Sequence, residues 1–129
     1  MRKPAPPRDI PPPLELECLK SLWKLSEASV KDVRDDLASR NLAYTTVMTL
    51  LDRLVKKGRA SRRKSGRMFI YAPAIPRMLV RGLAVKELVD SFFDGSEEEL
   101  LAYLKHRPAE QLEAADERSR VEQLDAALL

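Results

Sequence analysis

A run of cationic residues near the middle of the chain has the composition of a phosphate-binding surface. From residue 53 to residue 67 the sequence holds eight Lys or Arg side chains and no Asp or Glu. These cations are Arg53, Lys56, Lys57, Arg59, Arg62, Arg63, Lys64 and Arg67. Such a cluster attracts polyanions, because each phosphate that it neutralises releases a condensed counterion. A solvated basic face without a ligand is the alternative interpretation.

Short hydroxyl side chains directly before this run favour contact with DNA. A threonine can donate to phosphate or place its methyl group against thymine, and an arginine can hold guanine through two acceptors. We expect base contacts from Thr46, Thr49 and Arg53, although Arg53 could equally hold a phosphate or pair with a carboxylate. The hairpin cations are assigned to the phosphate backbone. The predicted DNA-binding residues are Tyr44, Thr45, Thr46, Thr49, Arg53, Lys56, Arg62, Arg63, Lys64 and Arg67.

Other kinds of chemistry lack the residues that they need. The chain has one histidine, His106, one cysteine, Cys18, and no Gly-rich phosphate loop, so we expect no enzyme activity, no metal site and no cofactor. Glu97, Glu98 and Glu99 suit a helix start, where they complement the helix dipole, better than a metal site. Cys18 lies beside an apolar stripe and is interpreted as a small buried hydrophobe.

The elements that must position the predicted DNA-binding residues are three helices and a hairpin. Helices are predicted over 13–25, from the Ser29 cap to about Arg40, and over 45–57, where Gly58 follows. Strands are predicted over 60–64 and 68–72, joined by a Ser65-Gly66 turn. The fold class is therefore mostly α with a small β-hairpin, a winged helix-turn-helix domain followed by a C-terminal helical dimerisation segment.

The second half of the chain has helical periodicity and more apolar residues than one solvated helix can carry. Helical spacing returns after Pro76 and breaks at Gly95, after which Ser96 and Glu99 repeat the cap pattern. Helicity is also expected over 109–129. We predict that the surplus apolar side chains pair with a second copy of the chain. The predicted dimerisation residues are Leu79, Val85, Leu88, Val89, Phe92, Phe93, Leu100, Leu101 and Leu104.

Charge divides the chain more sharply than its formal net charge of +3 indicates. Residues 1–81 hold 18 Lys or Arg and 8 Asp or Glu, whereas residues 82–129 hold 5 and 12. The first part alone therefore suits an anionic partner. We divide the chain into a flexible basic Pro-rich arm (1–12), a winged-helix DNA-binding domain (13–74) and a helical dimerisation domain (75–129).

The cysteine count and the lack of long apolar runs indicate where the protein works. A lone cysteine excludes an intramolecular disulfide and favours a reducing compartment, so a cytoplasmic location is expected. The apolar runs are too short for a membrane span, and the N-terminus lacks the apolar stretch of a secretion signal, so no membrane association is expected.

Several sequence blocks carry a resemblance to a known family. The longest is Ala43–Gly58, and it is preceded by Pro13–Glu17, Leu22-Trp23 and Ala28–Val33. Together they resemble the penicillinase and methicillin-resistance repressor family, which includes copper-responsive repressors. The resemblance implies a homodimer whose winged helix reads a palindromic operator through its third helix. It places the recognition surface on Tyr44, Thr45, Thr46, Thr49 and Arg53, and the wing on residues 62–67.

Two departures from the family pattern bear on induction. The copper-responsive branch carries a C-terminal cysteine cluster that this chain lacks, which disfavours release by a metal. Antibiotic-responsive members are inactivated by cleavage of an Asn-Phe bond, but no asparagine follows Asn41 here. The corresponding region is approximately Leu101–Lys105. An upstream sensor protease would therefore have to cleave a different bond, or a different signal acts.

The sequence as a whole predicts a dimeric transcriptional repressor. It would bind a palindromic double-stranded DNA operator through the third helix and the basic wing. The alternative is a winged-helix protein–protein adaptor without sequence-specific DNA binding, whose basic surface meets an acidic protein, because a fold does not dictate its use.

Overall fold

The computed structural model describes residues 9–107, which form two compact units divided between Val85 and Lys86. Most of the predicted arm and the helix expected over 109–129 lie outside the described residues. Within 9–107, each helix is too short or too polar to cross a bilayer.

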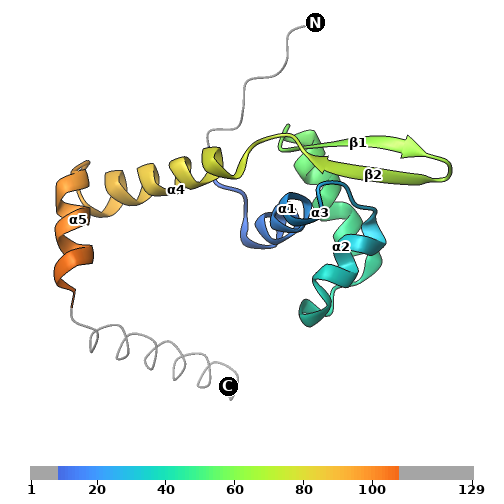
Figure 1. Ribbon diagram of the computed structural model, residues 1–129, viewed down its shortest axis with the longest axis horizontal. Coiled ribbons are helices and arrows are strands. Elements are labelled where there is room, and N and C mark those ends of the chain that lie inside the picture. The colour runs from blue at the N-terminus through green and yellow to red at the C-terminus, as the bar shows by residue number, and fades with distance from the viewer. Residues whose placement is uncertain (1–8, 108–129) are drawn as a thin grey trace, which may run out of the picture. The chain divides into compact units, whose positions relative to one another are not determined.

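Three helices build the first unit beside the hairpin (Figure 1). They are α1 (Pro13–Leu25), α2 (Val30–Asp36) and α3 (Tyr44–Lys56). The predicted Ser29 cap is confirmed: the Ser29 hydroxyl accepts from the Asp32 backbone N–H, and the Asp32 carboxylate accepts from that of Ser29. The predicted end of the second helix near Arg40 is wrong for the α-helix. The chain continues from Ala38 to Arg40 as a 3₁₀ turn and reverses at Asn41, whose φ is 51°.

The core of this unit is made where the apolar stripes of the three helices meet. Side chains of α1, α2 and α3 are buried together, as the helical spacing predicted. The members from these helices are Cys18, Leu19, Leu22, Val30, Val33, Val47, Leu50, Leu51 and Leu54. Burial raises the pKa of the Cys18 thiol to about 11, which leaves the thiol neutral. Its interpretation as a buried hydrophobe is confirmed.

The hairpin consists of antiparallel strands β1 (Ala60–Ser65) and β2 (Met68–Pro73). Ser65 pairs with Met68, so the loop residues are Gly66 and Arg67, one position later than predicted. Gly66 has a φ of +62°, which side chains rarely adopt, so a glycine suits this loop position. Backbone bonds of 2.9 and 2.8 Å join Ala28 and Tyr71 and attach β2 to the helices. This arrangement is the predicted winged helix (Figure 1).

Beyond the hairpin the chain is helical, as the periodicity predicted. Helix α4 spans Arg77–Phe92 and helix α5 spans Glu97–His106, with the Ser96 hydroxyl accepting from the Glu99 backbone N–H at 3.2 Å. In the second unit the rings of Phe93 and Tyr103 pack with centroids 5.8 Å apart. The predicted dimerisation residues differ in exposure within one copy of the chain. Leu79 packs on the core and Val89 is buried, Phe93 and Leu100 are half-buried, and Val85, Leu88, Phe92, Leu101 and Leu104 are exposed.

Candidate nucleic-acid interface

Helix α3 separates its two kinds of side chain onto two faces. Val47, Leu50, Leu51 and Leu54 are buried in the core. The opposite side is the α3 face, which we define as Tyr44, Thr45, Thr46, Thr49, Arg53 and Lys56, all of them exposed. One face of the helix can therefore meet a ligand without disturbing the packing of the other.

Two details of the α3 face are absent from the sequence-based prediction. The Thr49 hydroxyl donates to the Thr45 carbonyl at 2.9 Å, so what Thr49 offers a ligand is an acceptor and a methyl group. Met48 is also exposed, one helical turn from Tyr44. Its apolar side chain could contact a thymine methyl group. The sequence did carry a signal for this residue, because Met48 is an apolar side chain that lies outside the buried apolar stripe of α3.

Asp52 connects the hairpin to α3. Its carboxylate accepts the Tyr71 hydroxyl at 2.8 Å and the Arg62 guanidinium at 3.0 Å. Arg62 also lies over the Phe69 ring, 4.4 Å from its centroid. Burial, and then the hydrogen bond to Asp52, raises the pKa of Tyr71, so its hydroxyl keeps the proton that it donates. Helix α3 and the hairpin are thereby held in one relative orientation.

The remaining wing cations differ in their partners. Arg63 forms an ion pair with Glu27 at 3.1 Å, and both side chains are more than half exposed. Such a pair contributes little to stability and leaves Arg63 available to exchange partners. Lys64 and Arg67, at the tip of the hairpin, have no carboxylate within 4.0 Å among residues 9–107. The same holds for Arg53 and Lys56 on α3.

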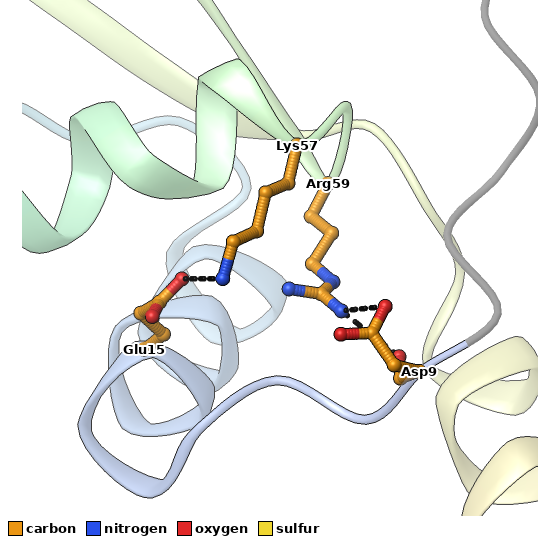
Figure 2. Close-up of polar contacts among 4 residues, drawn as sticks. All are labelled: Asp9, Glu15, Lys57 and Arg59. Carbon is orange, nitrogen blue, oxygen red and sulfur yellow. Dashed lines mark hydrogen bonds and ion pairs between the residues drawn. The ribbon is translucent and has the colours of Figure 1, made fainter.

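Two members of the cationic run pair with acids at the start of α1 or in the segment before it (Figure 2). Arg59 is fully buried, and its Nη2 donates to the carbonyl and to the Oδ1 of Asp9, each at 2.9 Å. Lys57 Nζ donates to Oε1 of Glu15, a buried residue, at 3.4 Å. The prediction that all eight cations form one phosphate-binding surface is therefore wrong for Arg59, whereas Lys57 stays exposed beside its acidic partner. The acids opposite these two cations are Glu15 in α1 and Asp9 in the segment before α1, which a local count of charge omits.

Arg59 is an unusual residue at the base of the wing. Its Nε and Nη1 atoms are buried and have no hydrogen-bond partner within the described chain. A buried guanidinium is costly unless it is paired, and Asp9 is its one carboxylate partner in residues 9–107. The pair ties the segment before α1 to the residue that leads into β1. Its role is therefore to hold the fold together rather than to bind a ligand.

The resulting surface has three exposed parts of defined chemistry. Hydroxyl and apolar groups lie at the start of α3, Arg53 and Lys56 at its end, and Lys64 and Arg67 at the hairpin tip. Four cations without acidic partners in residues 9–107 thus lie beside the hydroxyl and apolar groups at the start of α3. This arrangement can bind a rod-shaped polyanion at two regions of the polyanion's backbone. It would then place α3 against the edge of that polyanion.

The chain is similar to known proteins. The family model described as penicillinase repressor matches residues 12–125. Transcriptional regulator BlaI of Mycobacterium tuberculosis is 39% identical over 97 residues, 73% of this chain and 70% of that protein. The penicillinase repressor of Bacillus licheniformis is 31% identical over 83 residues, 64% of this chain and 65% of that protein. A solution structure of the monomeric form of B. licheniformis BlaI in complex with the blaP half-operator has 32% identity and a TM-score of 0.48, covering 58% of this chain and 93% of that one.

The Arg59–Asp9 pair generates a prediction about stability. Asp9→Ala should lower the free energy of unfolding, because it leaves a buried charge without its partner, and Arg59→Met should cost less or nothing. In the Arg59→Met background, Asp9→Ala should have almost no effect. Urea unfolding of the native chain, the two single variants and the double variant measures this double-mutant cycle. Equal losses from Asp9→Ala in both backgrounds would contradict it.

The same pair predicts a dependence on pH. A hydrogen bond from its own backbone and the charge of Arg59 lower the pKa of Asp9 in the folded protein. The stabilising effect of the Asp9 carboxylate should therefore be complete above its unfolded-state pKa of about 4. It should be lost as the pH falls through the lower pKa of the folded state. The stability difference between the native chain and Asp9→Asn should shrink accordingly below about pH 4.

Proposed function

Because the chain belongs to the penicillinase repressor family, we propose that it represses transcription by binding operator DNA and excluding the polymerase from the promoter. The observation that carries this proposal is the exposed α3 face, which includes Arg53 and Lys56, together with Lys64 and Arg67 at the hairpin tip; none of these four cations has an acidic partner in residues 9–107. A winged helix of this kind presents its third helix to the major groove while the wing reaches the neighbouring backbone. Such a protein would act in the cytoplasm, where the DNA lies.

The roles of individual residues follow from their places on the surface. Thr46, Thr49 and Arg53 are proposed to contact base edges, with Tyr44 and Thr45 at the entrance of the groove. Lys56, Arg62, Arg63, Lys64 and Arg67 are proposed to contact phosphates. Of these, Arg62 is held by Asp52 and so has its guanidinium positioned before DNA arrives. Pre-positioning reduces the entropy lost on binding.

Homodimerisation through the second unit is part of the proposal. Exposed apolar side chains on α4 and α5 support it, with Phe92 76% exposed and Leu101 55% exposed. Leu88, Tyr103 and Leu104 add to this apolar surface. Two winged helices related by a two-fold axis would read a palindromic operator, because the symmetry of the protein is mirrored in the site.

Relief of repression must differ from cleavage at an Asn-Phe bond, since no asparagine follows Asn41. The region Leu101–Lys105 lies within α5, where every backbone group is part of a helical turn. A sensor protease would need to open this helix locally before cutting a bond in it. A protease acting at another bond, or a different signal, is the proposed route.

Salt dependence tests the phosphate contacts. Binding to duplex DNA should weaken steeply with salt, and Lys64→Ala or Arg67→Ala should each reduce the log–log slope by about 0.9. Lys105→Ala removes the same charge from α5 and should leave the slope unchanged. Fluorescence anisotropy at several salt concentrations measures the slope of log affinity against log salt concentration for each variant. Failure of the native chain to shift any duplex, random or operator, would favour a protein–protein adaptor instead.

Base readout is tested separately from affinity. A binding selection from randomised duplexes should give a palindromic consensus for the native chain. Arg53→Ala should relax the preference at one position of each half-site by about 1–3 kcal/mol, and Thr49→Ala should relax a neighbouring position. Arg67→Ala is the control and should weaken all sequences alike. An unchanged consensus in both α3 variants would contradict the proposed roles.

The dimer is tested by sedimentation. At micromolar concentration the native chain should sediment as a dimer, and Phe92→Ser should shift it towards monomer because it removes a large exposed apolar group. Met68→Ser makes a similar change at an exposed residue of the hairpin and should leave the dimer intact. A stable native monomer at this concentration would contradict dimerisation.

A further inference from the structure

The first unit contains a pocket that the DNA-binding proposal does not use. It has a volume of about 550 Å³ and lies between α1, the end of α2 and the start of α4. Pockets of this size hold small organic molecules. None of its lining residues belongs to α3 or to the hairpin. The apolar lining residues are Ile10, Leu16, Trp23, Leu37, Val80 and Ala84.

Hydrogen bonds fix the walls of this pocket. The Trp23 indole N–H donates to the Ile75 carbonyl at 2.9 Å and so ties α1 to the start of α4. Also on α1, the Ser21 hydroxyl and the Lys24 ammonium both donate to Asp36 at the end of α2, each at 2.7 Å. The helices around the pocket are therefore joined by specific bonds and do not depend on a ligand to hold them apart.

Positive charge is in excess where α4 lines the pocket. Arg77 and Arg81 lie one turn apart on α4 and line the pocket. Neither has a carboxylate within 4.0 Å in the part of the chain that the structure describes. The Arg77 guanidinium lies 5.4 Å from the Trp23 ring centroid, and Arg81 makes a 3.8 Å contact to the Met78 sulfur.

The two acids of the pocket do not neutralise these arginines. Glu17 lies 3.5 Å from Arg40 and 4.0 Å from Lys20. Asp36 is occupied by Lys24 and Ser21, whose hydrogen bonds also lower its pKa and keep it ionised. The pocket therefore presents an apolar interior next to two guanidinium groups that have no carboxylate partner in residues 9–107. Guanidinium groups bind carboxylates through paired, charge-assisted hydrogen bonds.

We propose that this pocket binds a small organic carboxylate, with its apolar body against Trp23, Leu16 and Val80 and its carboxylate at Arg77 and Arg81. This site is separate from the DNA-binding surface and does not depend on it. The proposed ligand class combines the two features of the lining, because a fully apolar molecule would leave the arginines unpaired and a small inorganic anion would leave the apolar walls empty.

The test uses the full chain without DNA and the Trp23 indole N–H signal in NMR spectra. Trp23 is the one tryptophan in the sequence, so this signal reports on the pocket alone. The probe is 4-tert-butylbenzoate, and 4-tert-butylbenzamide is its uncharged counterpart with the same apolar body. The carboxylate should shift the signal saturably and bind about tenfold more tightly than the amide, the effect of one charge-assisted interaction.

Two sets of variants separate the pocket from general charge effects. Arg77→Gln combined with Arg81→Gln should remove the preference for the carboxylate while the amide still binds. Arg107→Gln, at the end of α5 outside the pocket lining, should leave both affinities unchanged. Equal affinities for the two probes in the native chain, or an equal loss with Arg107→Gln, would overturn the proposal. So would an indole signal that responds to protein concentration and not to the probe, because a second copy would then fill the pocket.

Discussion

The hydrogen bonds to the Asp52 carboxylate hold helix α3 and the hairpin together. Asp52 accepts from Tyr71 and Arg62, so one side chain of α3 connects to both strands of the hairpin. DNA presents its groove and its phosphates at a fixed spacing, and a protein that contacts both benefits from having the same spacing built in. This spacing also depends on the position of α3 itself, which is fixed because its apolar face is buried in the core.

Members of one cationic run thus have different roles. Arg53, Lys56, Lys64 and Arg67 remain on the surface without acidic partners in residues 9–107, while Arg62 is held in place by Asp52. Arg59 is buried and pairs with Asp9 before α1, while Lys57 is exposed and pairs with the buried Glu15 of α1 (Figure 2). The same residue types therefore provide ligand attraction at the surface and attachment in the interior, according to whether an acid lies opposite.

Much of the fold could be predicted because its signals are local. The apolar spacing of α1 and α3, the Ser29–Asp32 cap and the strand formers around Ile70 each act over a few residues. The hairpin turn was misplaced by one residue because Ser65-Gly66 and Gly66-Arg67 both suit a turn, and the pairing of Ser65 with Met68 selects the second. The 3₁₀ turn after α2 was missed because apolar spacing alone does not separate it from a continued α-helix; the chain leaves the α-helix at Leu37, whose φ is −99° and ψ 29°.

The sequence by itself determined the winged-helix class, the exposed composition of the α3 face and the repressor family, since periodicity and motif are properties of neighbouring residues. Only the tertiary structure decided which cations are free, that Asp52 joins α3 to the hairpin, and that Arg77 and Arg81 border a pocket. These pairings bring together residues from separate elements, such as Arg59 and Asp9, 50 positions apart. Through-space electrostatics and burial depend on such distances, and the order of residues along the chain does not contain them.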